Sequence, residues 1–159
     1  QALLKQLGDQ AYLYSEARFG DVKSRRCLIM DNMGILSRAY YHADVAVIGG
    51  GFGKGIHNTL EAAVYGIPLV FGPRYKRFDE AVQLIQCTAA ISASTPAQMA
   101  TSILGLLADD EDRIRRGVQA GNFVKSSAGA TPKIVGWVTQ KLGLEKNDGI
   151  GLEDKKEFN

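Results

Sequence analysis

Residues 44–74 read DVAVIGGGFGKGIHNTLEAAVYGIPLVFGPR, and this stretch decides the fold. After Asp44 the run is apolar with little alternation, as expected of a strand that is covered on both faces. A glycine-rich turn and a helix follow, and Gly66 stands where a left-handed residue ends the helix. The pattern therefore predicts a strand, a turn, a helix and a second strand, at 44–48, 49–55, 58–65 and 67–71. Such a unit is typical of a parallel α/β sheet.

The flanking sequence continues the alternation of strands and helices. Upstream, the spacing of apolar residues predicts a helix, two short strands and a helix capped by Asp31 or Asn32, at 2–7, 11–15, 26–30 and 33–42. Downstream it predicts a helix, a strand and three helices, at 78–86, 89–92, 96–108, 111–125 and 132–142. Thr95 and Pro96 suit the cap and first position of the first of these three. The predicted fold class is α/β, with a Rossmann-like parallel sheet and flanking helices.

Composition limits the classes of function. A chain of 159 residues with 45% hydrophobic content can form one ordinary domain, and a net charge of +2 gives no support for nucleic-acid binding. No apolar run reaches the roughly 18–20 residues of a membrane span. Residues 145–159 carry five acidic residues and three lysines without a periodic apolar face. We therefore expect a domain at 1–144 and a flexible polar tail at 145–159.

The glycine-rich turn predicts an anion site. In an open α/β sheet, ligands bind beyond the carboxyl ends of the strands, and the following helix directs its unpaired N–H groups there. The turn lacks the spacing of a P-loop and matches a dinucleotide fingerprint poorly. A phosphate remains the natural ligand, although many such turns are only tight connections. The candidate phosphate or sugar contacts are Gly51, Lys54, His57 and Arg74.

Asn58 and Glu61 allow two interpretations. Asn58 has the residue type of a helix cap, and a glutamate three residues later can return a hydrogen bond to the cap N–H. In the second interpretation, Glu61 lies one turn inside the helix and its carboxylate accepts hydrogen bonds from two ribose hydroxyls. The sequence alone leaves both open.

Two segments carry a resemblance to a known family. HNTLEAAVYGIPLVFGP (57–73) resembles the HNxLEpaxxgxPvxxGP signature of the 3-deoxy-manno-octulosonic acid (Kdo) transferases. DNMGILSRAYYHADVAVIGGGF (31–52) resembles the D-x-MGEL…aDxafvGGsf stretch of that family. The family consists of inverting glycosyltransferases of the two-domain GT-B type. The resemblance implies that this chain is a C-terminal, donor-binding domain, incomplete at its N-terminus with some strands missing.

The resemblance also implies site residues. Met33, Gly34 and Ile35 would line the cytidine side of the donor, CMP-Kdo. The phosphate and ribose of the donor would be bound by Asn58, Thr59, Leu60 and Glu61. At the position of Ile35 the family often has an acid, so only a backbone contact would survive there. No metal and no cofactor are implied, CMP-Kdo being a substrate, and the catalytic base is expected in an N-terminal domain, so this fragment alone should be inactive.

The implied reaction is transfer of Kdo from CMP-Kdo to a lipid A precursor in lipopolysaccharide biosynthesis. The intact enzyme would contact the membrane peripherally, on the cytoplasmic side of the bacterial inner membrane, and the fragment would be soluble. Missing strands would leave an open sheet edge, which favours self-association. The alternatives are a GT-B donor domain that uses a UDP-sugar and a non-catalytic α/β binding module.

Overall fold

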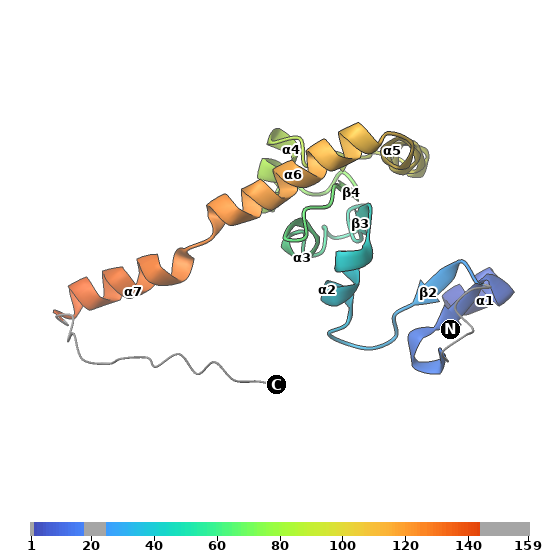
Figure 1. The fold of residues 1–159 in the computed structure, drawn as a ribbon, viewed down its shortest axis with the longest axis horizontal. Coiled ribbons are helices and arrows are strands. Elements are labelled where there is room, and N and C mark those ends of the chain that lie inside the picture. The colour runs from blue at the N-terminus through green and yellow to red at the C-terminus, as the bar shows by residue number, and fades with distance from the viewer. Residues whose placement is uncertain (1, 18–24, 144–159) are drawn as a thin grey trace. The chain divides into compact units, whose positions relative to one another are not determined.

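A computed structural model describes residues 2–17 and 25–143 (Figure 1). The predicted tail at 145–159 lies outside the described residues, so its boundary stays a prediction. The chain divides into two compact units, Gln1–Ser126 and Ser127–Asn159. Within the second unit the structure describes helix α7 (Ala130–Lys141).

The strands pair in parallel throughout the described residues, as the sequence predicts. They form a two-stranded sheet and a three-stranded sheet in the order β3-β4-β5. The strands are β1 (Ala11–Leu13), β2 (Cys27–Ile29), β3 (Ala46–Ile48), β4 (Leu69–Phe71) and β5 (Ala90–Ser92). In register, Val47 lies opposite Val70 and Val70 opposite Ile91. Parallel strands joined by helices give the α/β fold expected from the alternation along the chain.

Helices and short 3-10 turns connect the strands. The helices of the first unit are α1 (Ala2–Leu7), α2 (Leu36–Ala39), α3 (Leu60–Ala63), α4 (Asp79–Gln86), α5 (Pro96–Ala108) and α6 (Asp110–Ser127). The 3-10 turns are η1 (Gly8–Gln10), η2 (Tyr14–Glu16) and η4 (Tyr40–His42). The Thr95 hydroxyl accepts a hydrogen bond from the backbone N–H of Gln98 at 3.2 Å, so the predicted cap of α5 is confirmed. None of the described helices combines the length and apolar content that a membrane crossing requires.

Helix α2 is shorter than the predicted helix at 33–42, and its predicted cap is wrong. Gly34 adopts a left-handed φ of 84°, which keeps the turn before Leu36 out of the helix. Asp31 is engaged elsewhere, because its carboxylate accepts hydrogen bonds from the backbone N–H and the hydroxyl of Ser15. These bonds lower the pKa of Asp31 below its ordinary value.

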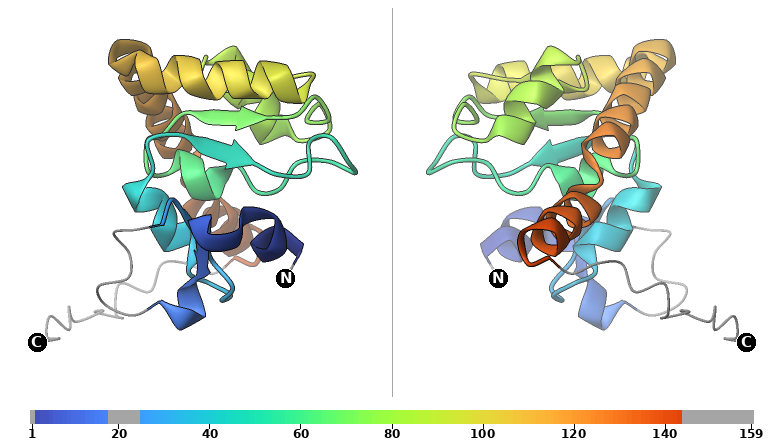
Figure 2. Two further views of the ribbon diagram at one scale, coloured as in Figure 1. Left: turned by 90° about the vertical axis from the view of Figure 1, so that its right-hand side faces the viewer. Right: turned by 90° about the vertical axis from the view of Figure 1, so that its left-hand side faces the viewer.

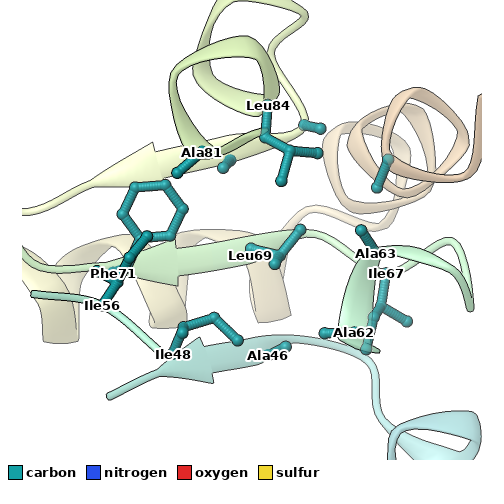
Figure 3. Close-up of a cluster of buried hydrophobic side chains, with 13 residues drawn as sticks. Ala46, Ile48, Ile56, Ala62, Ala63, Ile67, Leu69, Phe71, Ala81 and Leu84 are labelled. Atoms are coloured by element: carbon teal, nitrogen blue, oxygen red, sulfur yellow. The ribbon is translucent and has the colours of Figure 1, made fainter. Parts of the chain in front are cut away.

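The main hydrophobic cluster lies on one side of the three-stranded sheet. Figure 3 shows Leu84 of α4 projecting onto the side of β4 that carries Leu69 and Phe71, and all three side chains are fully buried. Burial of each such side chain contributes roughly 1.5–3 kcal/mol. Val70 alternates to the opposite side. Helix α5, which contacts β4, lies alongside the sheet in Figure 2.

Strand β3 is not covered on both faces, in contrast to the prediction. Ala46 and Ile48 are buried, but Val47 between them is 46% exposed. Among the described strands β3 pairs only with β4, so it is an edge strand of its sheet. The apolar run in the sequence could not distinguish an edge strand from a central one.

Candidate functional site

Two turns follow β3 and β4, and they interlock at the carboxyl ends of these strands. Gly51 is buried against Gly72 so closely that a Cβ at Gly51 would lie 2.5 Å from the Gly72 nitrogen. The backbone N–H of Arg74 donates to the carbonyl of Gly51 at 3.0 Å. The structure thus places Gly51, a predicted phosphate contact, in backbone packing between the two turns.

The glycine-rich turn also makes room for a histidine. Gly50 has a φ of 85°, and a Cβ there would lie 2.6 Å from Cδ2 of His57. The backbone N–H of His57 donates to the carbonyl of Gly49 at 3.0 Å. The turn therefore fixes the backbone of His57, and its lack of a side chain at Gly50 admits the imidazole ring.

His57, Asn58 and Glu61 line one hollow with a volume of about 420 Å³, which we call the β3 pocket. Three parts of the fold meet in it: the helical segment before β3, the end of β3, and the turn that leads into α3. The other lining residues are Leu36, Tyr40, Val47, Ile48 and Gly49. Apolar walls with a few convergent polar groups are typical of small-ligand sites.

Asn58 links the backbone of α3 to Glu61. Its side-chain oxygen accepts a hydrogen bond from the backbone N–H of Leu60 at 3.0 Å. Its side-chain nitrogen donates to Oε1 of Glu61, also at 3.0 Å. Glu61 is exposed, and the described bond of its carboxylate is to the Asn58 amide instead of the backbone N–H that a capping box requires. The Asn58 amide thus orients an accessible carboxylate in the β3 pocket.

Tyr40 lines the same pocket as this carboxylate. Burial raises the pKa of Tyr40, and the negative charge of Glu61 raises it further. The phenol is neutral at neutral pH, as a tyrosine ordinarily is, and can donate a hydrogen bond. The sequence gives no signal for Tyr40 as a pocket residue, because it falls within the helix that apolar spacing predicts at 33–42.

The remaining predicted donor residues are placed differently. Thr59 is fully buried, and its hydroxyl has no hydrogen-bond partner among the described residues. Leu60 is 40% exposed. Met33 is fully exposed, and neither it nor its neighbours Gly34 and Ile35 line the β3 pocket. Leu36 takes their place in its wall.

Lys54 and Arg74 line a second hollow of about 460 Å³, together with Pro73, Lys76 and Arg77. We call it the basic pocket. It shares no lining residue with the β3 pocket. The predicted phosphate contacts therefore divide into His57 in one pocket and Lys54 with Arg74 in the other. In the part of the chain that the structure describes, no three His, Cys, Asp or Glu residues gather as a metal site.

Comparison with known proteins finds relatives of this chain by sequence. No family model matches it. It is 31% identical over 118 residues to the 3-deoxy-D-manno-octulosonic acid transferase of Bordetella pertussis, a match that covers 73% of this chain and 28% of the relative. It is also 31% identical over 106 residues to the enzyme of the same name from Chlamydia muridarum, covering 65% and 24%. The chain thus spans about a quarter of the length of these relatives.

A solved structure matches the fold. It is the C-terminal CMP-Kdo binding domain of WaaA from Acinetobacter baumannii, which is 29% identical with a TM-score of 0.66. The match covers 77% of this chain and 65% of that one. Sequence and fold together therefore show that this chain is related to the Kdo transferases and corresponds to their C-terminal domain.

Proposed function

We propose that this chain is the donor-binding part of a glycosyltransferase that moves Kdo from CMP-Kdo to a lipid A precursor. One observation carries the proposal: the Asn58–Glu61 pair presents an oriented carboxylate in a pocket at the carboxyl end of β3. Ligands of α/β sheets bind at this end of the strands. The matching domain from Acinetobacter baumannii is itself described as CMP-Kdo binding.

The ribose of the donor fits the carboxylate of Glu61. A carboxylate is an acceptor with several lone pairs and can take hydrogen bonds from two adjacent hydroxyls. The Asn58 amide holds it in place and reduces the rotamer freedom that binding would otherwise remove. In this arrangement His57 and Tyr40 line the same pocket as the carboxylate, and they suit the phosphate or the sugar carboxylate of the ligand.

The other predicted contacts would involve Thr59 and the residues before α2. Thr59 is buried, so its part in binding would use main-chain groups at the start of α3. Met33, Gly34 and Ile35 precede α2 and would receive the cytosine base. The exposure of Met33 leaves a large apolar side chain available to cover a base.

In the proposed reaction an acceptor hydroxyl attacks the anomeric carbon of Kdo, and the bond from that carbon to the phosphate oxygen breaks. CMP leaves with the electron pair, and a base removes the hydroxyl proton. That base and the acceptor site are assigned to an N-terminal domain of the intact enzyme, which would contact the membrane peripherally. The present chain would bind CMP-Kdo without transferring it.

Calorimetric titration of the chain with CMP and with UMP tests the proposal. We expect CMP to bind more tightly than UMP, and Glu61→Gln to weaken CMP binding by roughly 10- to 100-fold, because charge-assisted hydrogen bonds are lost. Glu111→Gln is the matched control, since Glu111 is an exposed acid in the first turn of α6. If Glu61→Gln folds and binds CMP like the control variant, Glu61 is not a ligand residue and the donor site has to be sought elsewhere.

A further inference from the structure

The basic pocket carries a concentration of positive charge that has no role in the donor site proposed for the β3 pocket. Four cations line it, namely Lys54, Arg74, Lys76 and Arg77, with Pro73 as the only uncharged lining residue. All four are exposed. Like charges that share a concave surface repel one another and raise the electrostatic potential inside it.

Among the described residues, no acidic side chain forms an ion pair with these four cations. Every described ion pair within 4.0 Å involves an arginine of α6. On that helix Asp112 accepts from both Arg115 and Arg116, and the two arginines keep its pKa below the ordinary value. Within residues 2–17 and 25–143, the acids thus neutralise the arginines of α6 and form no ion pair with the cations of the basic pocket.

The two arginines of the pocket are held in place before any ligand arrives. Nη1 of Arg74 donates to the carbonyl of Gly53 at 2.8 Å, and Nη2 of Arg77 donates to the carbonyl of Lys54 at 2.9 Å. A guanidinium has five N–H donors, so each arginine can bind a carbonyl and still present donors to a ligand. Such preorganisation reduces the entropy cost of binding an oxyanion.

From this geometry we infer that the basic pocket binds the phosphate group of a phosphate monoester. A monoester carries a charge of about −1.5 to −2 at neutral pH and three acceptor oxygens, which suits four cations better than a singly charged carboxylate does. The volume of about 460 Å³ exceeds what a bare phosphate fills and falls in the range of small-ligand pockets. The pocket therefore has room for more of the ligand than its phosphate group.

Two sources can supply this chemistry: a soluble sugar phosphate or a phosphomonoester headgroup at a lipid surface. Glucose 1-phosphate, titrated by calorimetry, represents the first. Sedimentation with vesicles of equal parts phosphatidylcholine and phosphatidic acid represents the second, with pure phosphatidylcholine vesicles as the reference. Neither probe contains a nucleotide, so the result does not depend on whether the β3 pocket binds CMP-Kdo.

Lys76→Gln is the variant of choice, because Lys76 makes no described side-chain hydrogen bond that holds the turn in place. Its matched control is Lys125→Gln, which removes the same charge from an exposed position on α6. We expect wild type and the control to bind at least one probe, and Lys76→Gln to bind it about tenfold more weakly. Lys54→Gln combined with Lys76→Gln should abolish binding.

Binding of glucose 1-phosphate alone would identify a soluble ligand, and recruitment to phosphatidic acid alone a lipid headgroup. Both results support a phosphate site. The inference is overturned if neither probe binds wild type, or if Lys76→Gln and Lys125→Gln weaken binding equally, because the attraction would then come from the overall charge of the chain.

Discussion

At the scale of single residues, Thr59 allows a test of what a buried hydroxyl without a described hydrogen-bond partner costs in stability. Its hydroxyl is fully buried and accepts and donates no hydrogen bond among the described residues. An unsatisfied buried polar group costs about 1–3 kcal/mol. Thr59→Val should therefore raise the free energy of unfolding by about 1 kcal/mol, measured by urea denaturation.

Thr95→Val is the control, and we expect it to change the free energy of unfolding in the opposite direction. It makes the same chemical change but removes the cap of α5, so it should lower the free energy of unfolding by about 1 kcal/mol. A comparable loss of stability in Thr59→Val would mean that the Thr59 hydroxyl has a partner after all, for example a bound water.

The sequence predicted individual site residues only where they belong to a local motif. Asn58 and Glu61 are three positions apart, so their proximity on one helix turn could be read directly from the sequence. Tyr40 and Glu61 line one pocket although more than twenty positions separate them, and no local spacing encodes that proximity. The role of each residue toward a ligand stays a prediction.

At the scale of elements, α6 depends on a close approach to the end of α3. A Cβ on Gly117 would lie 2.2 Å from the carbonyl oxygen of Gly66, which is backbone and cannot rotate away. Gly117→Ala should therefore lower the free energy of unfolding by about 1–3 kcal/mol, as other overpacking substitutions do. Thermal unfolding followed by circular dichroism measures the change.

Gly105→Ala provides the matched comparison on α5. A Cβ at Gly105 meets nothing within 4 Å, so the substitution should stabilise the helix by about 0.5–1 kcal/mol. Equal effects of the two substitutions would show that α6 can shift away from Gly66 at little cost.

The order and type of the helices and strands were predicted correctly, but the residues at which they begin and end were not. The predicted helix at 58–65 is regular only over α3, residues Leu60–Ala63, before it closes at Gly66. Apolar periodicity extends beyond the residues that keep helical hydrogen bonds, because loops also bury apolar side chains. The exposure of Val47 depends on which strands stand beside β3, and this is tertiary information that the run VAVI does not contain.

At the scale of the whole molecule, the edge of β3 bears on the association of chains. Among the described strands β3 pairs only with β4, and Val47 on it is 46% exposed. An apolar edge strand invites pairing with another chain. We expect sedimentation equilibrium to give an average mass above the 17.2 kDa of one chain, increasing with concentration.

Val47→Lys should shift this equilibrium toward the monomer, because a lysine on an edge strand opposes pairing. Val118→Lys is the control, since Val118 is a comparably exposed valine on α6. A single species of 17.2 kDa for the wild type at all concentrations would contradict the expectation.

The family relationship was also predictable at this scale, because the motifs at 31–52 and 57–73 are specific to the family and extend into both turns. The division of the side chains between two pockets was not predictable. The sequence places Lys54 and His57 around the glycine-rich turn and Arg74 after the Gly72-Pro73 turn, whereas the structure puts Lys54 with Arg74 in one pocket and His57 in the other. The pocket that each side chain lines depends on how the two turns pack against each other.

The contact of Gly51 with Gly72 limits how the two pockets can diversify. Backbone lies against backbone there, so a side chain added to one glycine would clash with the backbone of the other turn. A smaller side chain on that other turn could not remove the clash. A change of ligand preference, natural or engineered, must therefore come from side chains that line the pockets, such as His57 and Lys76. The backbone contact between the two glycines stays fixed.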